Sequence, residues 1–98
     1  MSALHRIAAC GVVPVVVIDD SAAAPALGDA LIAGGLPVAE ITFRTSAAVQ
    51  VIDLLAQDPR FTVGAGTVLS PADVDRAVAA GAVVVRSRLH GSVTFSAF

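Results

Sequence analysis

Three polar residues at alternate positions of one apolar segment are the strongest candidates for chemistry. Glu40, Thr42 and Arg44 alternate with apolar side chains in the segment that begins at Val38. Because successive side chains of a strand point to opposite faces, these residues predict a carboxylate, a hydroxyl and a guanidinium on one face. Four residues of strand span about 13 Å, which is too far for Glu40 and Arg44 to pair comfortably. Charges are costly in so apolar a segment, so we expect each to have another partner or to serve a ligand.

A second candidate lies at the end of the apolar segment 62–68. Gly64, Ala65 and Gly66 precede Thr67, but Leu69 stands where a dinucleotide-binding fingerprint needs its third glycine. Glycines inside a strand more simply indicate close packing. Thr67 is expected at the carboxyl end of its strand, where parallel α/β sheets bind their ligands.

The composition excludes several kinds of partner and chemistry. The net charge is −2, with six arginines against eight acidic residues, so no basic surface for nucleic acid is expected. The chain has no lysine, which excludes a P-loop and a Schiff base from a side-chain amine. The longest charge-free runs, Ile7–Ile18 and Phe61–Ala72, have 12 residues each and are too short to span a membrane.

Metal and thiol chemistry are not expected either. Cys10 is the only cysteine, so there is no internal disulfide and no zinc pattern of several cysteines. We interpret it as a small buried apolar residue. His5 and His90 lie near the ends of the chain without metal-ligand spacing. The sequence therefore predicts no metal site.

Strand and helix patterns alternate along the chain. Apolar β-branched runs predict strands over 12–18, 38–44 and 62–68 and from 83 onward; amphipathic patterns predict helices over 24–33, 46–57 and from Ser70 to Gly81. Ser70 is a suitable N-cap, and Gly81 a suitable end, for the last helix. Such alternation is typical of an α/β fold with a parallel sheet and right-handed crossovers.

Three of these segments carry a family resemblance. They read Val-Val-Pro-Val-Val-Val at 12–17, Ala-Glu-Ile-Thr-Phe-Arg-Thr at 39–45 and Val-Gly-Ala-Gly-Thr-Val-Leu at 63–69. In order and spacing they closely resemble the first half of the 2-keto-3-deoxy-6-phosphogluconate (KDPG) aldolases. The resemblance implies parallel β-α repeats that form the N-terminal half of a (β/α)8 TIM barrel, with residues 1–85 as a partial aldolase domain.

The resemblance also implies an activity and roles for three residues. Members of the family are cytoplasmic enzymes of the Entner–Doudoroff route, usually homotrimers, that cleave a keto sugar acid into pyruvate and glyceraldehyde 3-phosphate. No cofactor, nucleic acid or membrane is implied; the partner is a small keto acid. Glu40 matches the carboxylate that moves protons through water, whereas Arg44 and Thr67 match the groups that hold the pyruvate carboxylate. A guanidinium suits that task because it donates two parallel N–H bonds.

The chain departs from the family pattern in one decisive respect. The family forms its Schiff base with a lysine on the sixth strand, and no lysine exists here. We therefore expect this chain to be inactive alone. Half of a (β/α)8 barrel also leaves its first and fourth strands as edges without a further partner, so we expect these edges to promote association. Two alternatives stay open: a half-barrel that only binds a small keto acid, or a different α/β enzyme that uses Glu40 without a lysine.

The family pattern also ends after Val85. Where the family continues with a Ser-Pro-Gly-type loop, this chain reads Arg-Ser-Arg-Leu-His at 86–90. The codons CGN-TCC-CGG-CTT-CAC encode that segment, and read one base later they give Pro-Gly-Phe-Thr after the first residue. The sequence thus suggests a divergent tail over 86–98 that arises from a frameshift.

Overall fold

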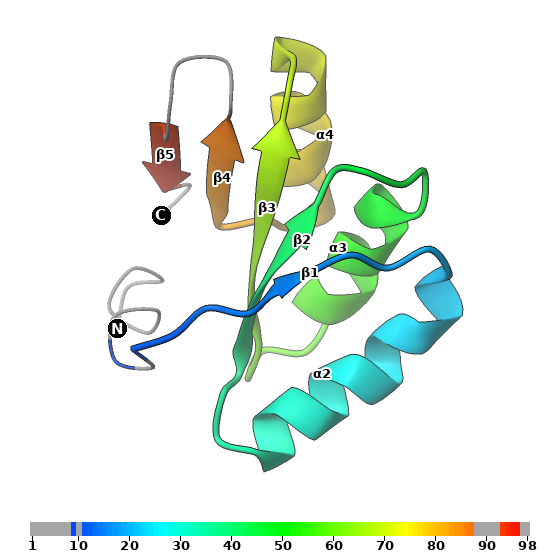
Figure 1. Ribbon diagram of the computed structural model, residues 1–98, viewed down its shortest axis with the longest axis vertical. Coiled ribbons are helices and arrows are strands. Elements are labelled where there is room, and N and C mark those ends of the chain that lie inside the picture. The colour runs from blue at the N-terminus through cyan, green and yellow to red at the C-terminus, as the bar shows by residue number, and fades with distance from the viewer. Residues whose placement is uncertain (1–8, 10, 88–92, 97–98) are drawn as a thin grey trace.

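A single five-stranded sheet organises the protein. The computed structural model describes residues 9, 11–87 and 93–96. In chain order the elements are β1 (Val15–Val16), the short 3-10 helix η1 (Ser21–Ala23), α2 (Ala24–Ala33), β2 (Val38–Thr42), α3 (Ala48–Ala56), β3 (Thr62–Val68), α4 (Pro71–Ala80), β4 (Val84–Ser87) and β5 (Val93–Ser96). The strands lie side by side in sequence order, and α2, α3 and α4 cover one side of the sheet (Figure 1). The predicted α/β fold with four parallel strands is confirmed.

The strand register separates two faces of the sheet. One row of aligned residues runs across the first four strands as Val16, Ile41, Ala65 and Val85. These residues belong to the apolar core between sheet and helices, and the last three are at most 1% exposed. The neighbouring row contains Val15, Glu40, Gly64 and Val84, one residue earlier on each strand. Because side chains alternate, this second row points away from the helices.

The helix ends follow the local chemistry of the sequence. Ser70 has extended backbone, and its hydroxyl accepts a hydrogen bond from the Asp73 amide at 3.2 Å. Gly81 ends α4 with a φ of 115°, a left-handed conformation that favours glycine. At the start of the chain's first described α-helix, Asp20 caps η1 through the Ala22 amide, and Pro25 falls in the first turn of α2.

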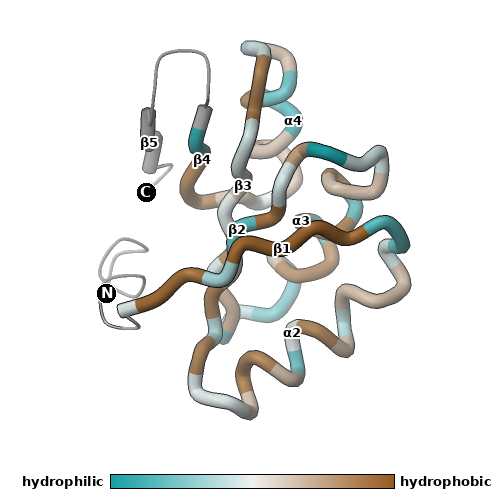
Figure 2. The backbone as a smooth tube through the Cα atoms, viewed as in Figure 1, coloured by the Kyte–Doolittle hydropathy of each residue, from teal (hydrophilic) through white to brown (hydrophobic). Residues whose placement is uncertain are grey.

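Three predicted segments are shorter in the structure. The strand expected over 12–18 is regular only at Val15–Val16. It begins after Pro14, which has no N–H to donate to a ladder, although the Pro14 carbonyl accepts a 2.8 Å hydrogen bond from the Glu40 amide. Figure 2 shows this segment as apolar on both sides of a short paler interruption just before β1. The second strand ends at Thr42 and its helix begins at Ala48, because the chain turns between them and Thr45 donates to the Ile18 carbonyl at 2.6 Å.

The expectation that the fourth strand lacks a second partner is wrong. β5 pairs with β4 in antiparallel register, from Val84 opposite Ser96 to Ser87 opposite Val93. The antiparallel partner satisfies backbone groups that an edge strand would otherwise leave unpaired. The pattern of alternating strands and helices predicts only parallel neighbours, so it gave no signal for this antiparallel pair.

The predictions for one cysteine and two histidines concern residues that the structure does not describe. His5, Cys10 and His90 lie outside the described residues, so their predicted roles stay predictions. Within the described part, none of the helices has the length and apolar character needed to cross a bilayer.

Candidate active site

Glu40 is a buried acid in the middle of the sheet. It lies on β2, flanked by β1 and β3, and the residue is 8% exposed. Its Oε1 atom lies 3.5 Å from Nη1 of Arg86 on β4, and the arginine side chain is half exposed. A buried carboxylate is costly without a partner, and Arg86 supplies a cation. The prediction that Glu40 pairs with something other than Arg44 therefore agrees with this geometry.

Sequence reasoning missed Arg86 as a part of this site. The two strands that carry the pair are not neighbours, because β3 lies between them. Across this gap, β3 presents Gly64 and Gly66 on the same face as Glu40. A signal was present: two glycines at alternate positions leave room for a side chain of one neighbouring strand to reach the other.

Thr42 makes a structural contact. It is 4% exposed, and its hydroxyl donates to the Val16 carbonyl of β1 at 3.4 Å. Although Thr42 shares a strand face with Glu40, as predicted, this contact ties β2 to the edge strand. Thr42 therefore holds two strands together and does not belong to the candidate site.

Thr67 has an unusual backbone conformation. Its φ is 56°, which makes it the only residue other than glycine with positive φ in the described part of the chain. The pairing of β3 with β4 also shifts register between Ala65 and Val68, so a bulge surrounds Thr67. A β-branched residue in the left-handed region is strained by about 1–3 kcal/mol, and such strain clusters at functional sites. Bulges also change the direction in which a side chain points.

Arg44 and Thr67 follow equivalent points of two adjacent strands. The Phe43 amide donates to the Gly66 carbonyl at 2.8 Å, and each candidate residue comes directly after one of these partners. Arg44 is exposed in the turn after β2, and Thr67 is partly exposed near the end of β3. The structure therefore brings these two predicted residues to the carboxyl edge of the parallel strands, with Glu40 further inside the same sheet.

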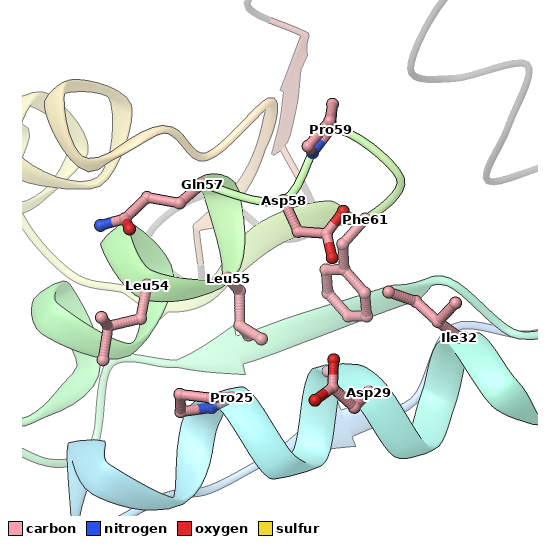
Figure 3. Close-up of a pocket in the computed structure, with 10 residues that line it drawn as sticks. Pro25, Asp29, Ile32, Leu54, Leu55, Gln57, Asp58, Pro59 and Phe61 are labelled. Atoms are coloured by element: carbon pink, nitrogen blue, oxygen red, sulfur yellow. The ribbon is translucent and has the colours of Figure 1, made fainter.

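A pocket of about 490 Å³ lies elsewhere, between α2 and the end of α3. Figure 3 shows Pro25 and Asp29 facing Leu55 and Phe61 across it. The segment that closes the pocket, after α3, leads into the amino end of β3, whereas Thr67 lies near the other end of that strand. The pocket and the predicted residues are therefore two separate regions.

An acid beside this pocket has a perturbed pKa. The Arg60 guanidinium donates to Asp58 at 2.7 and 3.1 Å, and the Arg60 amide donates at 2.9 Å. These hydrogen bonds, first from the side chain and then from the backbone, lower the pKa of Asp58 from 3.8 to about 2. The Asp58 carboxylate in turn raises the pKa of Arg60. Among the described residues no group of three metal-ligating side chains occurs.

The fold and the position of these side chains define a class. The chain is a parallel α/β protein whose predicted ligand-binding groups gather at the carboxyl edge of its strands. A model of the KDPG and KHG aldolase family matches residues 4–90. The chain belongs to this family, and its strands and helices correspond to the N-terminal part of a TIM-barrel aldolase.

Individual relatives agree with this assignment. The chain is 47% identical over 70 residues to the 2-dehydro-3-deoxy-phosphogluconate aldolase of Zymomonas mobilis, a match that covers 71% of this chain and 34% of that protein. It is 44% identical over 72 residues to the KHG/KDPG aldolase of Escherichia coli, covering 72% and 34%. A crystal structure of the KDPG aldolase from Legionella pneumophila, with pyruvate captured as a covalent carbinolamine intermediate, matches with a TM-score of 0.79 and 40% identity, over 89% of this chain and 43% of that one. The chain thus spans about a third of the length of the curated relatives it matches.

Proposed function

We propose that this chain carries the pyruvate-binding half of an aldolase site that acts on KDPG. The observation that carries the proposal is the hydrogen bond from Phe43 to Gly66, which aligns Arg44 and Thr67 at one edge of the sheet. The complete enzyme would cleave KDPG to pyruvate and glyceraldehyde 3-phosphate in the cytoplasm, as a homotrimer. Family membership supports this assignment.

Each of the three predicted residues has a task in this proposal. Arg44 donates two parallel N–H bonds to the pyruvate carboxylate, and the Thr67 hydroxyl donates a third. Glu40 accepts and returns protons through a water molecule. Its place between β1 and β3 holds the carboxylate in a largely water-free environment, which suits a group that must exchange protons with one ordered water.

We further propose that the 98-residue chain does not catalyse the cleavage by itself. Imine formation needs an unprotonated primary amine beside the keto carbon. The sequence has no lysine, and arginine stays protonated at any usable pH. Without an imine the substrate carbon is not activated, so Glu40 has no acidic proton to move.

Borohydride trapping with pyruvate tests this proposal. We expect no pyruvyl adduct between residues 7 and 98 in the mass spectrum and no cleavage of KDPG. The L. pneumophila aldolase, in which pyruvate has been captured covalently, serves as the positive control. A trapped adduct inside this range, or cleavage that disappears in Glu40→Gln, would overturn the proposal.

The isolated chain is also proposed to associate. Val12, Val15 and Val17 are 65, 60 and 50% exposed along the segment that contains β1. Exposed apolar strands at the edge of a sheet favour pairing with another chain. Analytical ultracentrifugation at micromolar concentration should show oligomers; a monodisperse monomer contradicts this.

The tail over 86–98 is proposed to arise from a frameshift. The support is the degenerate codon set described above, in which one shifted base restores Pro-Gly-Phe-Thr. Sequencing the gene across the codons for Val85–Gly91 decides the matter. Codons there that cannot yield this loop in another frame would exclude the frameshift.

A further inference from the structure

Gly66 lies directly beneath the carboxyl group of Glu40. A Cβ atom built on Gly66 would lie 2.6 Å from Cδ of Glu40 and 2.9 Å from both its Cγ and its Oε2. Real Cβ atoms essentially never approach other heavy atoms below 3.0 Å. Any other residue at position 66 would therefore displace the Glu40 side chain or the strand.

The absence of a side chain at Gly66 is not explained by the backbone. Among the described glycines, only Gly11, Gly35 and Gly81 have positive φ, so the conformation of Gly66 is open to any L-residue. A strand interior is otherwise a poor place for glycine, which loses more conformational entropy on folding than alanine by about 0.5–1 kcal/mol. The close approach of Glu40 supplies the reason that the backbone lacks.

The same space explains how the ion pair crosses a strand. Glu40 is on β2 and Arg86 is on β4, and the carboxyl lies over Gly66 on the strand between them. A Cβ at this point would block the path that brings Oε1 to 3.5 Å from the guanidinium. Gly66 therefore controls both where the carboxyl lies and which cation it meets.

We propose that Gly66 is a positioning residue for Glu40, because the space above it holds the carboxyl over β3 and in contact with Arg86. Its importance for proton transfer rests on the function proposed above, whereas the steric relation between the two residues does not. Gly66 touches no substrate in this proposal; it acts through Glu40.

Gly64 provides a matched comparison. It lies two residues earlier on the same strand and face, and a Cβ there would meet the Val84 carbonyl oxygen at 3.1 Å. None of its three nearest atoms belongs to Glu40. Substitution at Gly64 should thus be harmful for a reason that does not involve the carboxylate.

The test measures whether truncation of Glu40 rescues Gly66→Ala. The chain has no tryptophan or tyrosine, so thermal unfolding is followed by far-ultraviolet circular dichroism. We expect Gly66→Ala to lower the melting temperature by roughly 10 °C, and by less than half as much when Glu40→Ala is also present. The loss caused by Gly64→Ala should be the same with and without Glu40→Ala.

A chemical readout follows the carboxyl itself. The Glu40 side chain is 10% exposed, so its coupling to a small amine by carbodiimide should be slow in the native chain. In folded Gly66→Ala the displaced carboxyl should react several-fold faster, and in Gly64→Ala the rate should not change. A merely structural role of Gly66 would leave this rate unaltered below the melting transition.

Each outcome bears on the proposal and is independent of aldolase activity. Equal losses of melting temperature for Gly66→Ala in both backgrounds, or an unchanged coupling rate, overturn it. If Gly66→Ala does not fold, the double variant Glu40→Ala/Gly66→Ala should fold, because truncation of Glu40 removes the atoms that the new Cβ would meet. A double variant that does not fold, when Glu40→Ala alone does fold, also overturns the proposal. Failure of the borohydride prediction alone would leave the steric relation intact.

Discussion

The two faces of the sheet are built from the same strands but differ in the side chains that they bury. Toward the helices, Ile41, Ala65 and Val85 align in one row of fully buried apolar side chains. One residue earlier on the same strands, the opposite face has Glu40 beside Gly64. Close apolar packing stabilises the first face. On the second face the glycines of β3 leave space that the Glu40 carboxyl occupies. The comparison teaches that the same strands can build an apolar layer on one face and position a buried charged group on the other.

The largest expected effect comes from damage to the helix-facing row. Ile41 is 0% exposed, so Ile41→Ala removes apolar contacts and leaves a cavity. We expect a loss of about 3 kcal/mol in the free energy of unfolding, measured by urea titration. Val15 serves as the control, because it is a 60% exposed apolar residue in the other row. Val15→Ala should change the free energy by less than about 0.5 kcal/mol, and equal losses for both variants would contradict the comparison.

The next effect has the opposite sign and lies at the carboxyl edge. Thr67 has a φ of 56°, which disfavours a residue with a Cβ. Thr67→Gly should be about 1 kcal/mol more stable than Thr67→Ala, because both lose the hydroxyl but only glycine relieves the strain. Equilibrium unfolding of the two variants gives the answer. If the alanine variant is as stable as the glycine variant, Thr67 stores no strain.

A smaller effect is expected from the ion pair on the face of the sheet that points away from the helices. The Arg86 side chain is 51% exposed and its contact with Glu40 is 3.5 Å long. A double-mutant cycle with Glu40→Gln and Arg86→Gln should give a coupling below about 1 kcal/mol, reduced further by salt. A coupling above about 2 kcal/mol, or one that salt leaves unchanged, would contradict a contact in which the arginine is half exposed.

The smallest effect belongs to the amino-end pocket. The pKa of Asp58 is lowered to about 2, so its contribution to stability is fully present above pH 3.8 and is lost as the pH falls toward 2. The melting temperatures of the wild type and Asp58→Asn should therefore differ at neutral pH and converge over this window. A difference that stays constant down to pH 2 would rule out the pair with Arg60 as its cause.

The row that faces the helices was easier to predict than the row that points away from them, for a physical reason. Alternation of apolar and polar residues along 38–44 and the apolar run 62–68 report local geometry, so both strands, and the buried face of the first, were predicted from the sequence. The contact between Glu40 and Arg86 joins strands that are separated by a third, and it depends on side-chain size at Gly66. The bulge at Thr67 and the antiparallel pairing of β4 with β5 likewise depend on contacts between strands, which a local pattern does not encode.

The site residues show the same division. Glu40, Arg44 and Thr67 were predicted from strand position and family resemblance, and the structure brings the last two to one edge. Arg86 lies in the segment interpreted as a divergent tail, where no family pattern pointed to it. Its role became visible only through its distance to Glu40.

Amide chemical shifts during a pyruvate titration test the central claim most directly. We expect shifts at residues 43–45 and 66–68 that do not saturate below millimolar pyruvate, because two or three hydrogen bonds barely offset the freedom lost on binding. Arg44→Ala should abolish them, and the amides of Gly28 and Leu54 at the other pocket should stay in place. Shifts confined to that pocket, or micromolar binding that survives Arg44→Ala, would contradict the account.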